Sequence, residues 1–390
     1  MKRWPLFLRA MRPLLCLMVV VWPGQQSRTV EPPKSPIHFT PRSIPFSLDS
    51  CETPQRHAPE TMAGGVAVFD YDNDGNLDIF FTNGADITTL KKDSPKYSNH
   101  LFHNNGDGTF TDVTEKSGLA QMDKEYGPLW SVGAAWVDVN NDGLLDLFVV
   151  NYMSWNVNKE PPCTFEGKPE YCHPKFYKEL PNQLFLNMGD GKFVDISEKS
   201  GIRAHPGKGM GVGVADYDGD GLPDIFVSND KLFNFLFHNQ GNARFEEVAF
   251  DAGVALPEHG SLISGMGVDF KDLNNDGYPD IVIVALDNET FPVFQNDGKG
   301  GFVEITSRSG MTALSNPMSA YSPNIADFDN DGWKDIFVSR GHVQSPNMAG
   351  RSQIDQPNTV FRNLGGSKFS ALTEEAGFTA LPPRRHRGAA

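Results

Sequence analysis

One nine-residue pattern of acidic side chains occurs five times in this 390-residue chain. Its form is Asp-x-Asp/Asn-x-Asp-Gly-x-x-Asp, so side-chain oxygens fall at positions 1, 3, 5 and 9. The five copies begin at Asp70, Asp138, Asp216, Asp272 and Asp327. Five matches to one pattern indicate that the chain is built from repeats.

Oxygen ligands at this density favour calcium, which takes about 6–8 hard oxygen ligands. The glycine at position 6 permits the sharp turn that gathers the oxygens, and the residue at position 7 can add its backbone carbonyl. About five Ca²⁺ sites are therefore predicted. Their ligands are Asp70, Asp72, Asp74, Asn76 and Asp78; Asp138, Asn140, Asp142, Leu144 and Asp146; Asp216, Asp218, Asp220, Leu222 and Asp224; Asp272, Asn274, Asp276, Tyr278 and Asp280; and Asp327, Asp329, Asp331, Trp333 and Asp335.

Three alternatives to these calcium loops are weaker. An EF-hand needs Glu at position 12, where all five copies have an apolar residue: Phe81, Val149, Val227, Ile283 and Val338. Turn capping by Asp or Asn explains one such residue per turn, but not three or four carboxylates that repel one another. Magnesium rarely takes all-protein cages. Because Asn140 and Asn274 replace a carboxylate at position 3, the second and fourth loops should bind calcium more weakly.

Each loop lies between two predicted β-strands. A strand of small residues precedes the loop, as in 64–69, and an apolar run of β-branched and aromatic residues follows it. A third strand such as 99–104 and a Gly-rich turn then lead to a fourth strand such as 109–114. Four short strands per repeat predict an all-β fold, a β-propeller of four-stranded antiparallel blades. The five blades are expected to begin near residues 64, 132, 209, 265 and 321.

The N-terminal residues are typical of a secretory signal peptide. Residues 1–12 include four basic residues and no acidic one, and an apolar run of nine residues, 14–22, follows. A membrane anchor is excluded on length, because about 20 apolar residues are needed to cross a bilayer. We therefore expect a signal peptide over residues 1–26 and secretion to an extracellular or periplasmic space.

The closure of the ring is a separate question. The segment 27–60 contains two stretches, 37–40 and 43–46, that resemble a fourth strand and could complete a blade. The repeats fill 61–390, and the fifth one ends near Phe378. We expect a ring that is incomplete or unusually closed, and we favour a truncated or split gene product, for which a separately encoded C-terminal piece would complete the ring.

Two cysteines, Cys163 and Cys172, flank a short segment that contains its own Gly and Pro. In an oxidising compartment this spacing suits a local disulfide, worth about 2–3 kcal/mol on the chain-entropy model. A metal-binding pair is the weaker alternative, because zinc favours Cys-x-x-Cys spacing and only His173 lies nearby. Cys51 is left without a predicted partner.

The charge balance excludes one class of function. The chain has 34 Lys and Arg against 49 Asp and Glu, a net charge of -15. Nucleic-acid binding needs clustered positive charge, so it is not expected. Eighteen of the acidic residues stand at ligand positions of the loops. The acidity is therefore concentrated in the predicted cation cages.

The loops with their flanking strands resemble FG-GAP/VCBS repeats, such as those of integrin α-chain propellers. The unit Asn-x-Leu-Phe-x-Asn-x-Gly-x-Gly-x-Phe-x-Asp-Val resembles secreted bacterial proteins of the cartilage acidic protein-like family, which often end in an ASPIC/UnbV domain, and so does the segment 163–172. The resemblance covers roughly residues 37–390, and this chain ends before such a domain. It implies calcium-stabilised scaffolding or adhesion and no established reaction.

No enzyme is predicted, because the chain lacks a Gly-x-Ser-x-Gly elbow, a His-Glu-x-x-His helix and a Walker loop. His103 and His238 occupy one third-strand position in two repeats, and we interpret them as inherited with the repeat. The leading hypothesis is a secreted calcium-binding propeller that acts as an interaction or adhesion scaffold for a protein or glycan partner. The alternative is a carbohydrate-binding or carbohydrate-acting protein that uses the loop face. Its support is a set of aromatic residues expected to be exposed: Tyr152, Trp155, Tyr171 and Tyr177.

Overall fold

The computed structural model describes residues 54–61, 64–83, 97–120, 123–127, 129–156, 158–316, 318–343 and 355–378. The chain divides into two compact units, Met1–Ser43 and Ile44–Ala390. All described residues belong to the second unit. The predicted signal peptide over 1–26, the stretches 37–40 and 43–46, and Cys51 lie outside the described residues.

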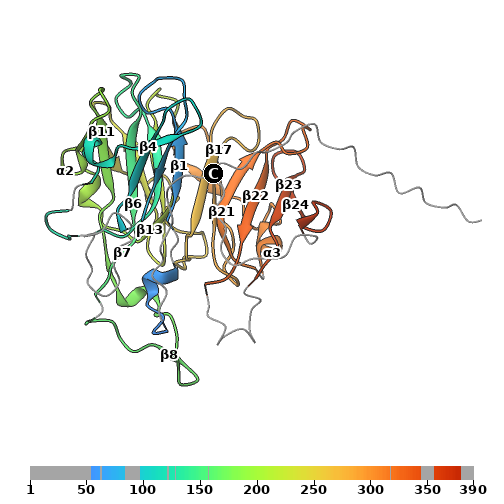
Figure 1. Ribbon diagram of the computed structural model, residues 1–390. Helices are drawn as coiled ribbons and strands as arrows, with labels where there is room; N and C mark the ends of the chain where they lie inside the picture. The colour runs from blue at the N-terminus through green and yellow to red at the C-terminus, as the bar shows by residue number, and fades with distance from the viewer. Residues whose placement is uncertain are drawn as a thin grey trace, which may run out of the picture. The chain divides into compact units, whose positions relative to one another are not determined.

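The described residues form five four-stranded antiparallel blades arranged as a β-propeller (Figure 1). The predicted fold class is therefore confirmed. The first two blades contain β1 (Val66–Phe69), β2 (Asp78–Phe81), β3 (His100–Asn104) and β4 (Phe110–Asp112), then β5 (Ser131–Val137), β6 (Asp146–Asn151), β11 (Gln183–Asn187) and β12 (Phe193–Asp195). The third blade contains β13 (Gly209–Ala215), β14 (Asp224–Asn229), β15 (Phe235–Asn239) and β16 (Phe245–Glu247). The last two contain β17 (Gly267–Lys271), β18 (Asp280–Val284), β19 (Val293–Asn296) and β20 (Phe302–Glu304), then β21 (Ala320–Ala326), β22 (Asp335–Arg340), β23 (Thr359–Asn363) and β24 (Phe369–Leu372).

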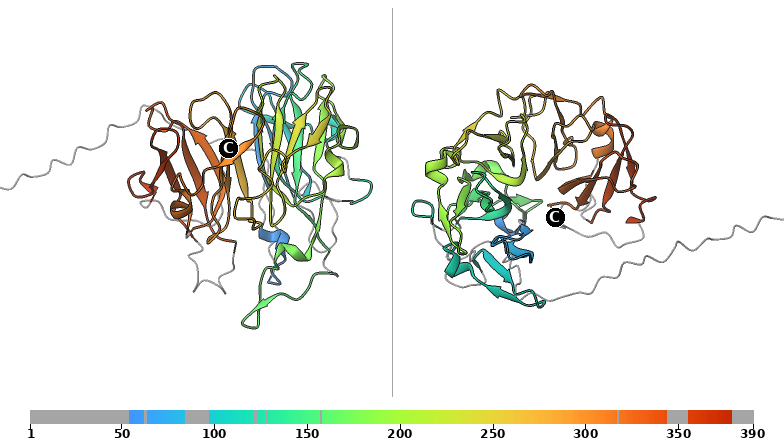
Figure 2. Two further views of the ribbon diagram at one scale, coloured as in Figure 1. Left: turned by 180° about the vertical axis from the view of Figure 1, so that it is seen from behind. Right: turned by 90° about the horizontal axis from the view of Figure 1, so that it is seen from above.

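The first strands of successive blades lie against one another. β1 contacts β5, β5 contacts β13, β13 contacts β17, and β17 contacts β21. Figure 2 shows the blades following one another in chain order. The small residues of these strands permit the close approach. A Cβ added at Gly211 would lie 2.7 Å from the Cα of Gly267 in the next blade. Glycine is therefore needed where β13 and β17 meet.

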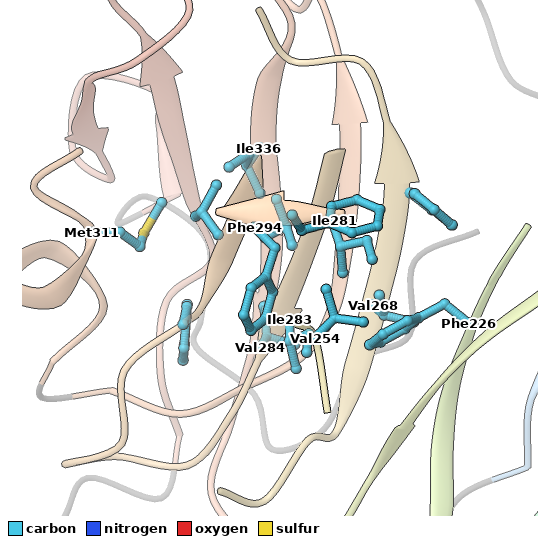
Figure 3. Packing of buried hydrophobic residues seen from close by; sticks show 14 of the residues in the cluster. Phe226, Val254, Val268, Ile281, Ile283, Val284, Phe294, Met311 and Ile336 are labelled. Carbon is cyan, nitrogen blue, oxygen red and sulfur yellow. The ribbon is translucent and has the colours of Figure 1, made fainter. Parts of the chain in front are cut away.

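Apolar side chains between the blades form the core. In the third, fourth and fifth blades one cluster joins Phe226, Val268, Ile281, Phe294 and Ile336, all of them buried (Figure 3). Two further clusters join the earlier blades. The rings of Phe69 and Trp136 stack between β1 and β5 with their centroids 3.4 Å apart. The alternating strands thus bury one face of each blade against its neighbour.

An insertion between β6 and β11 carries two small hairpins. In the first, β7 (Met153–Ser154) pairs with β10 (Lys178–Glu179), and in the second, β8 (Thr164–Phe165) pairs with β9 (Lys168–Pro169). A disulfide joins Cys163 to Cys172 at the base of the second hairpin. The helical turns are short: η1 (Ala58–Thr61), α1 (Thr114–Ser117), η3 (Pro174–Phe176), α2 (Ser197–Ser200), η4 (Ile202–Ala204) and α3 (Met311–Ser315). Among the described residues, no helix has the length and apolar character needed to span a membrane.

Candidate metal centres

Each acidic loop connects the first strand of a blade to the second and folds around its position 1 aspartate. In all five loops the backbone N–H of the position 6 glycine donates a hydrogen bond to that carboxylate, at 2.7 to 3.0 Å. The glycines have φ of 86 to 92°, a region that favours glycine. The turn therefore depends on the Gly of the pattern.

The position 5 aspartate orders the second half of the loop. Its Oδ1 accepts the backbone N–H of position 7 at 2.8 to 3.0 Å in every copy. In the second and fourth loops the position 3 amide of Asn140 or Asn274 donates to the other oxygen of this aspartate. In these two loops an internal hydrogen bond thus engages one oxygen of the position 5 carboxylate.

The position 9 aspartate begins the second strand and is buried in every blade. Asp78, Asp146 and Asp224 are 0% exposed, and Asp280 and Asp335 are 1% exposed. One carboxylate oxygen accepts the backbone N–H of loop position 2, at 2.9 to 3.2 Å. The other accepts the backbone N–H of the asparagine that ends the third strand, at 2.7 to 2.9 Å. Each oxygen keeps a lone pair for a cation.

Burial of these carboxylates shifts their pKa. The pKa of Asp146 is raised to about 7, mainly by desolvation; two backbone hydrogen bonds oppose this rise, and the neighbouring charges of Asp142 and Asp138 add to it. Burial likewise raises the pKa of Asp224 and of Asp280 to about 6. It also raises the pKa of Asp78 and of Asp335. A buried negative charge favours a bound cation or a proton, because without either it is poorly compensated.

The carboxylates converge in three of the loops. Single oxygens of Asp70, Asp72 and Asp74 lie within 4.8 Å of one another in the first loop. The same spacing joins positions 1, 3 and 9 in the third and fifth loops: Asp216, Asp218 and Asp224, and Asp327, Asp329 and Asp335. Hard oxygen donors at this spacing fit a divalent cation such as Ca²⁺. The predicted carbonyl ligands at position 7 stay a prediction, as do the sites in the second and fourth loops.

Two histidines that sequence reasoning set aside lie at these loops. Nδ1 of His103 is 3.2 Å from Asp72 and 3.4 Å from Asp78, and His103 forms a candidate metal group with them. His238 forms the same kind of group with Asp218 and Asp220. Their interpretation as inherited residues without chemistry is therefore incomplete. The signal that could have found them is their register, one residue before the asparagine that ends the third strand.

Asparagine side chains connect neighbouring loops. The position 4 amide donates to the glycine carbonyl of the next loop in Asn73 to Gly143, Asn141 to Gly221 and Asn275 to Gly332. The asparagine that ends the third strand also reaches the preceding blade. Asn187, for example, donates to the carbonyl of Tyr71 at 3.0 Å. The order of one loop is therefore coupled to the loops beside it.

The aromatic residues of the insertion are not the exposed set that the sequence suggested. Tyr152 is 3% exposed, Trp155 is 6% exposed and Tyr177 is 7% exposed. The hydroxyl of Tyr177 donates to Glu160, and the hydroxyl of Tyr152 donates to Asp230 at 2.6 Å. The prediction of exposed aromatic side chains is wrong for these three residues, because all three pack in one hydrophobic cluster and both tyrosine hydroxyls have internal hydrogen-bond partners.

The family model for FG-GAP-like repeats matches residues 70–149, 177–227, 216–283 and 272–338. Cartilage acidic protein 1 of Mus musculus is 29% identical over 317 residues, 80% of this chain and 43% of that protein. Cartilage acidic protein 1 of Homo sapiens is 29% identical over 80% of this chain and 42% of that protein. Neither name denotes an enzyme, and the chain spans about two fifths of the length of these relatives.

A solved structure with a similar fold is the six-bladed β-propeller lectin of Aleuria aurantia, 11% identical, with a TM-score of 0.40 over 79% of this chain and 77% of that chain. A second is an Agrocybe aegerita lectin that recognises terminal N-acetylglucosamine, 18% identical, with a TM-score of 0.34 over 82% of both chains. The repeats, the loops and the matched ranges agree. The chain belongs to the family of FG-GAP-like repeat proteins.

Proposed function

We propose that this protein is a secreted β-propeller that binds calcium in the loops between its first and second strands and acts as an interaction or adhesion scaffold. The observation that carries the proposal is the position 9 aspartate. It is a carboxylate buried in all five blades, and in the third loop it lies within 4.8 Å of two further carboxylates. A divalent cation compensates this charge, and oxygen donors are the ligands that Ca²⁺ prefers.

Calcium in this position has a structural role. The position 9 carboxylate accepts a hydrogen bond from the asparagine that ends the third strand, and the side chain of that asparagine donates a hydrogen bond to the preceding blade. A cation that fixes the carboxylate therefore stabilises the hairpin and the contact between two blades. A rigid ring of this kind can present loops to a partner, which is the basis for the scaffold role. The proposed role is structural and not catalytic.

Secretion is supported by two features. The N-terminal pattern is that of a signal peptide over 1–26, and the Cys163–Cys172 disulfide suits an oxidising compartment.

The carbohydrate alternative loses its original support, because most of the aromatic residues that suggested it are buried. A glycan array in the presence of calcium tests that alternative directly.

Calorimetric titration of calcium-stripped protein tests the calcium claim. We expect binding heat with CaCl₂ and a much weaker response with MgCl₂, because magnesium keeps its water and fits all-protein cages poorly. The absence of binding with either ion would contradict the proposal. Mass analysis of the exported protein tests secretion, since an N-terminus that still contains residues 1–26 would contradict processing.

A further inference from the structure

In the first, third and fifth blades, the residue that precedes the last asparagine of the third strand lies beside the acidic loop of its own blade. In the first and third blades this residue is His103 or His238, each close to the loop carboxylates. The second and fourth blades have Leu186 and Gln295 at this position. The fifth blade has Arg362. The arginine is the one residue of these five that carries a permanent positive charge.

The guanidinium of Arg362 lies among the loop carboxylates. Its Nε is 2.6 Å from Oδ2 of Asp329, and its Nη2 is 3.0 Å from Oδ2 of Asp331. These carboxylates are positions 3 and 5 of the fifth loop, two of its four predicted side-chain ligands. Asp329 also belongs to the group of three carboxylates that could hold a metal ion in this loop. The guanidinium and a metal ion would therefore share a ligand.

We infer that Arg362 takes the place of calcium in the fifth loop, so that this loop is held by an internal cation and the protein binds four calcium ions, not five. This inference rests on the proposed calcium function of the other loops. A divalent ion at the carboxylates would lie close to the guanidinium and be repelled by it, because like charges at short range disfavour each other. The arginine is attached to the chain, so its local concentration does not fall when calcium is removed.

The remaining charges of the fifth loop agree with this assignment. Position 8 of this loop is Lys334, whose Nζ lies 3.4 Å from Asn275 of the neighbouring loop. The third loop also has four aspartates, but it has Pro223 at position 8 and His238 at the third-strand position. The two loops thus have the same set of acidic ligands and differ in the basic residues around them.

A reciprocal exchange between these two blades tests the inference. Arg362→His gives the fifth blade the residue of the third, and His238→Arg gives the third blade the residue of the fifth. Both side chains are partly exposed, so neither exchange should unfold the ring. The measurement is the number of calcium ions retained by full-length protein in native mass spectrometry, with circular dichroism as the check on folding.

The wild-type protein is expected to retain four calcium ions, Arg362→His five and His238→Arg three. Arg362→Gln serves as a second variant, and it should also gain one ion. Five ions in the wild-type protein, unchanged in Arg362→His, would overturn the inference and leave the calcium function intact. No retained calcium in any variant would instead overturn the proposed function itself.

Discussion

Replacement of Asp146 by Asn should reduce the pH dependence of stability in calcium-free protein. Asp146 is buried, and its pKa is raised from 3.8 to about 7. A carboxyl with a raised pKa stabilises the fold while it is protonated, and this stability is lost as the pH rises from the unfolded pKa to the folded one. A shift of about 3 units corresponds to about 4 kcal/mol of unfolding free energy. About 2 kcal/mol of this falls between pH 5 and pH 7.

Urea denaturation at pH 5 and pH 7, followed by tryptophan fluorescence in calcium-free buffer, measures the difference. Wild-type protein should lose stability over this interval, and Asp146→Asn should lose about 2 kcal/mol less. The control is Asp190→Asn in the same blade, whose exposed side chain should leave the wild-type pH dependence nearly intact. An equal pH dependence in wild type and Asp146→Asn would refute the claim that the buried negative charge of Asp146 destabilises the fold when no cation is bound.

Three further outcomes follow from the same contacts. Asn187→Ala removes hydrogen bonds to the buried carbonyls of Tyr71 and Leu145, so urea denaturation should show a loss of about 2–4 kcal/mol, and a loss below 0.5 kcal/mol would contradict the bridging role. The double variant Cys163→Ser, Cys172→Ser should lower the unfolding free energy by about 2–3 kcal/mol. If the disulfide does not form, neither the double variant nor reduction of the wild-type protein changes the stability. Asp218→Ala should remove one calcium ion in native mass spectrometry while the fold is retained, and an unchanged count would exclude Asp218 as a ligand.

The blade architecture could be predicted because its signals are local. The acidic loops recur at fixed spacing, and each lies between a small-residue strand and an apolar strand, such as β1 and β2. The third strand of the fourth blade, Val293–Asn296, was harder to find. It lacks the Asn-x-Leu-Phe or Asn-x-Val-Phe start of the other repeats and keeps only the final Phe-x-Asn. The helical turns were not expected, because each is only one turn long.

The surroundings of the loops could not be predicted from a nine-residue pattern. Arg362 and His103 lie outside the loops in sequence, and only the register of the third strand brings them to the carboxylates. The buried carboxylate at position 9 likewise accepts a hydrogen bond from outside the pattern, from the backbone N–H of Asn187 on the third strand. The insertion misled sequence reasoning because aromatic residues in a connecting segment suggest a binding surface, whereas Tyr152 and Tyr177 pack inward.

The central claim is that calcium holds the acidic loops together, and thermal unfolding with and without calcium tests it most directly. Calcium at 100 times its dissociation constant adds about 2.7 kcal/mol of stability per site. Wild-type protein should therefore melt at a clearly higher temperature in calcium than in EGTA, and magnesium should restore little of the difference. An identical melting temperature in calcium and in EGTA would contradict the account.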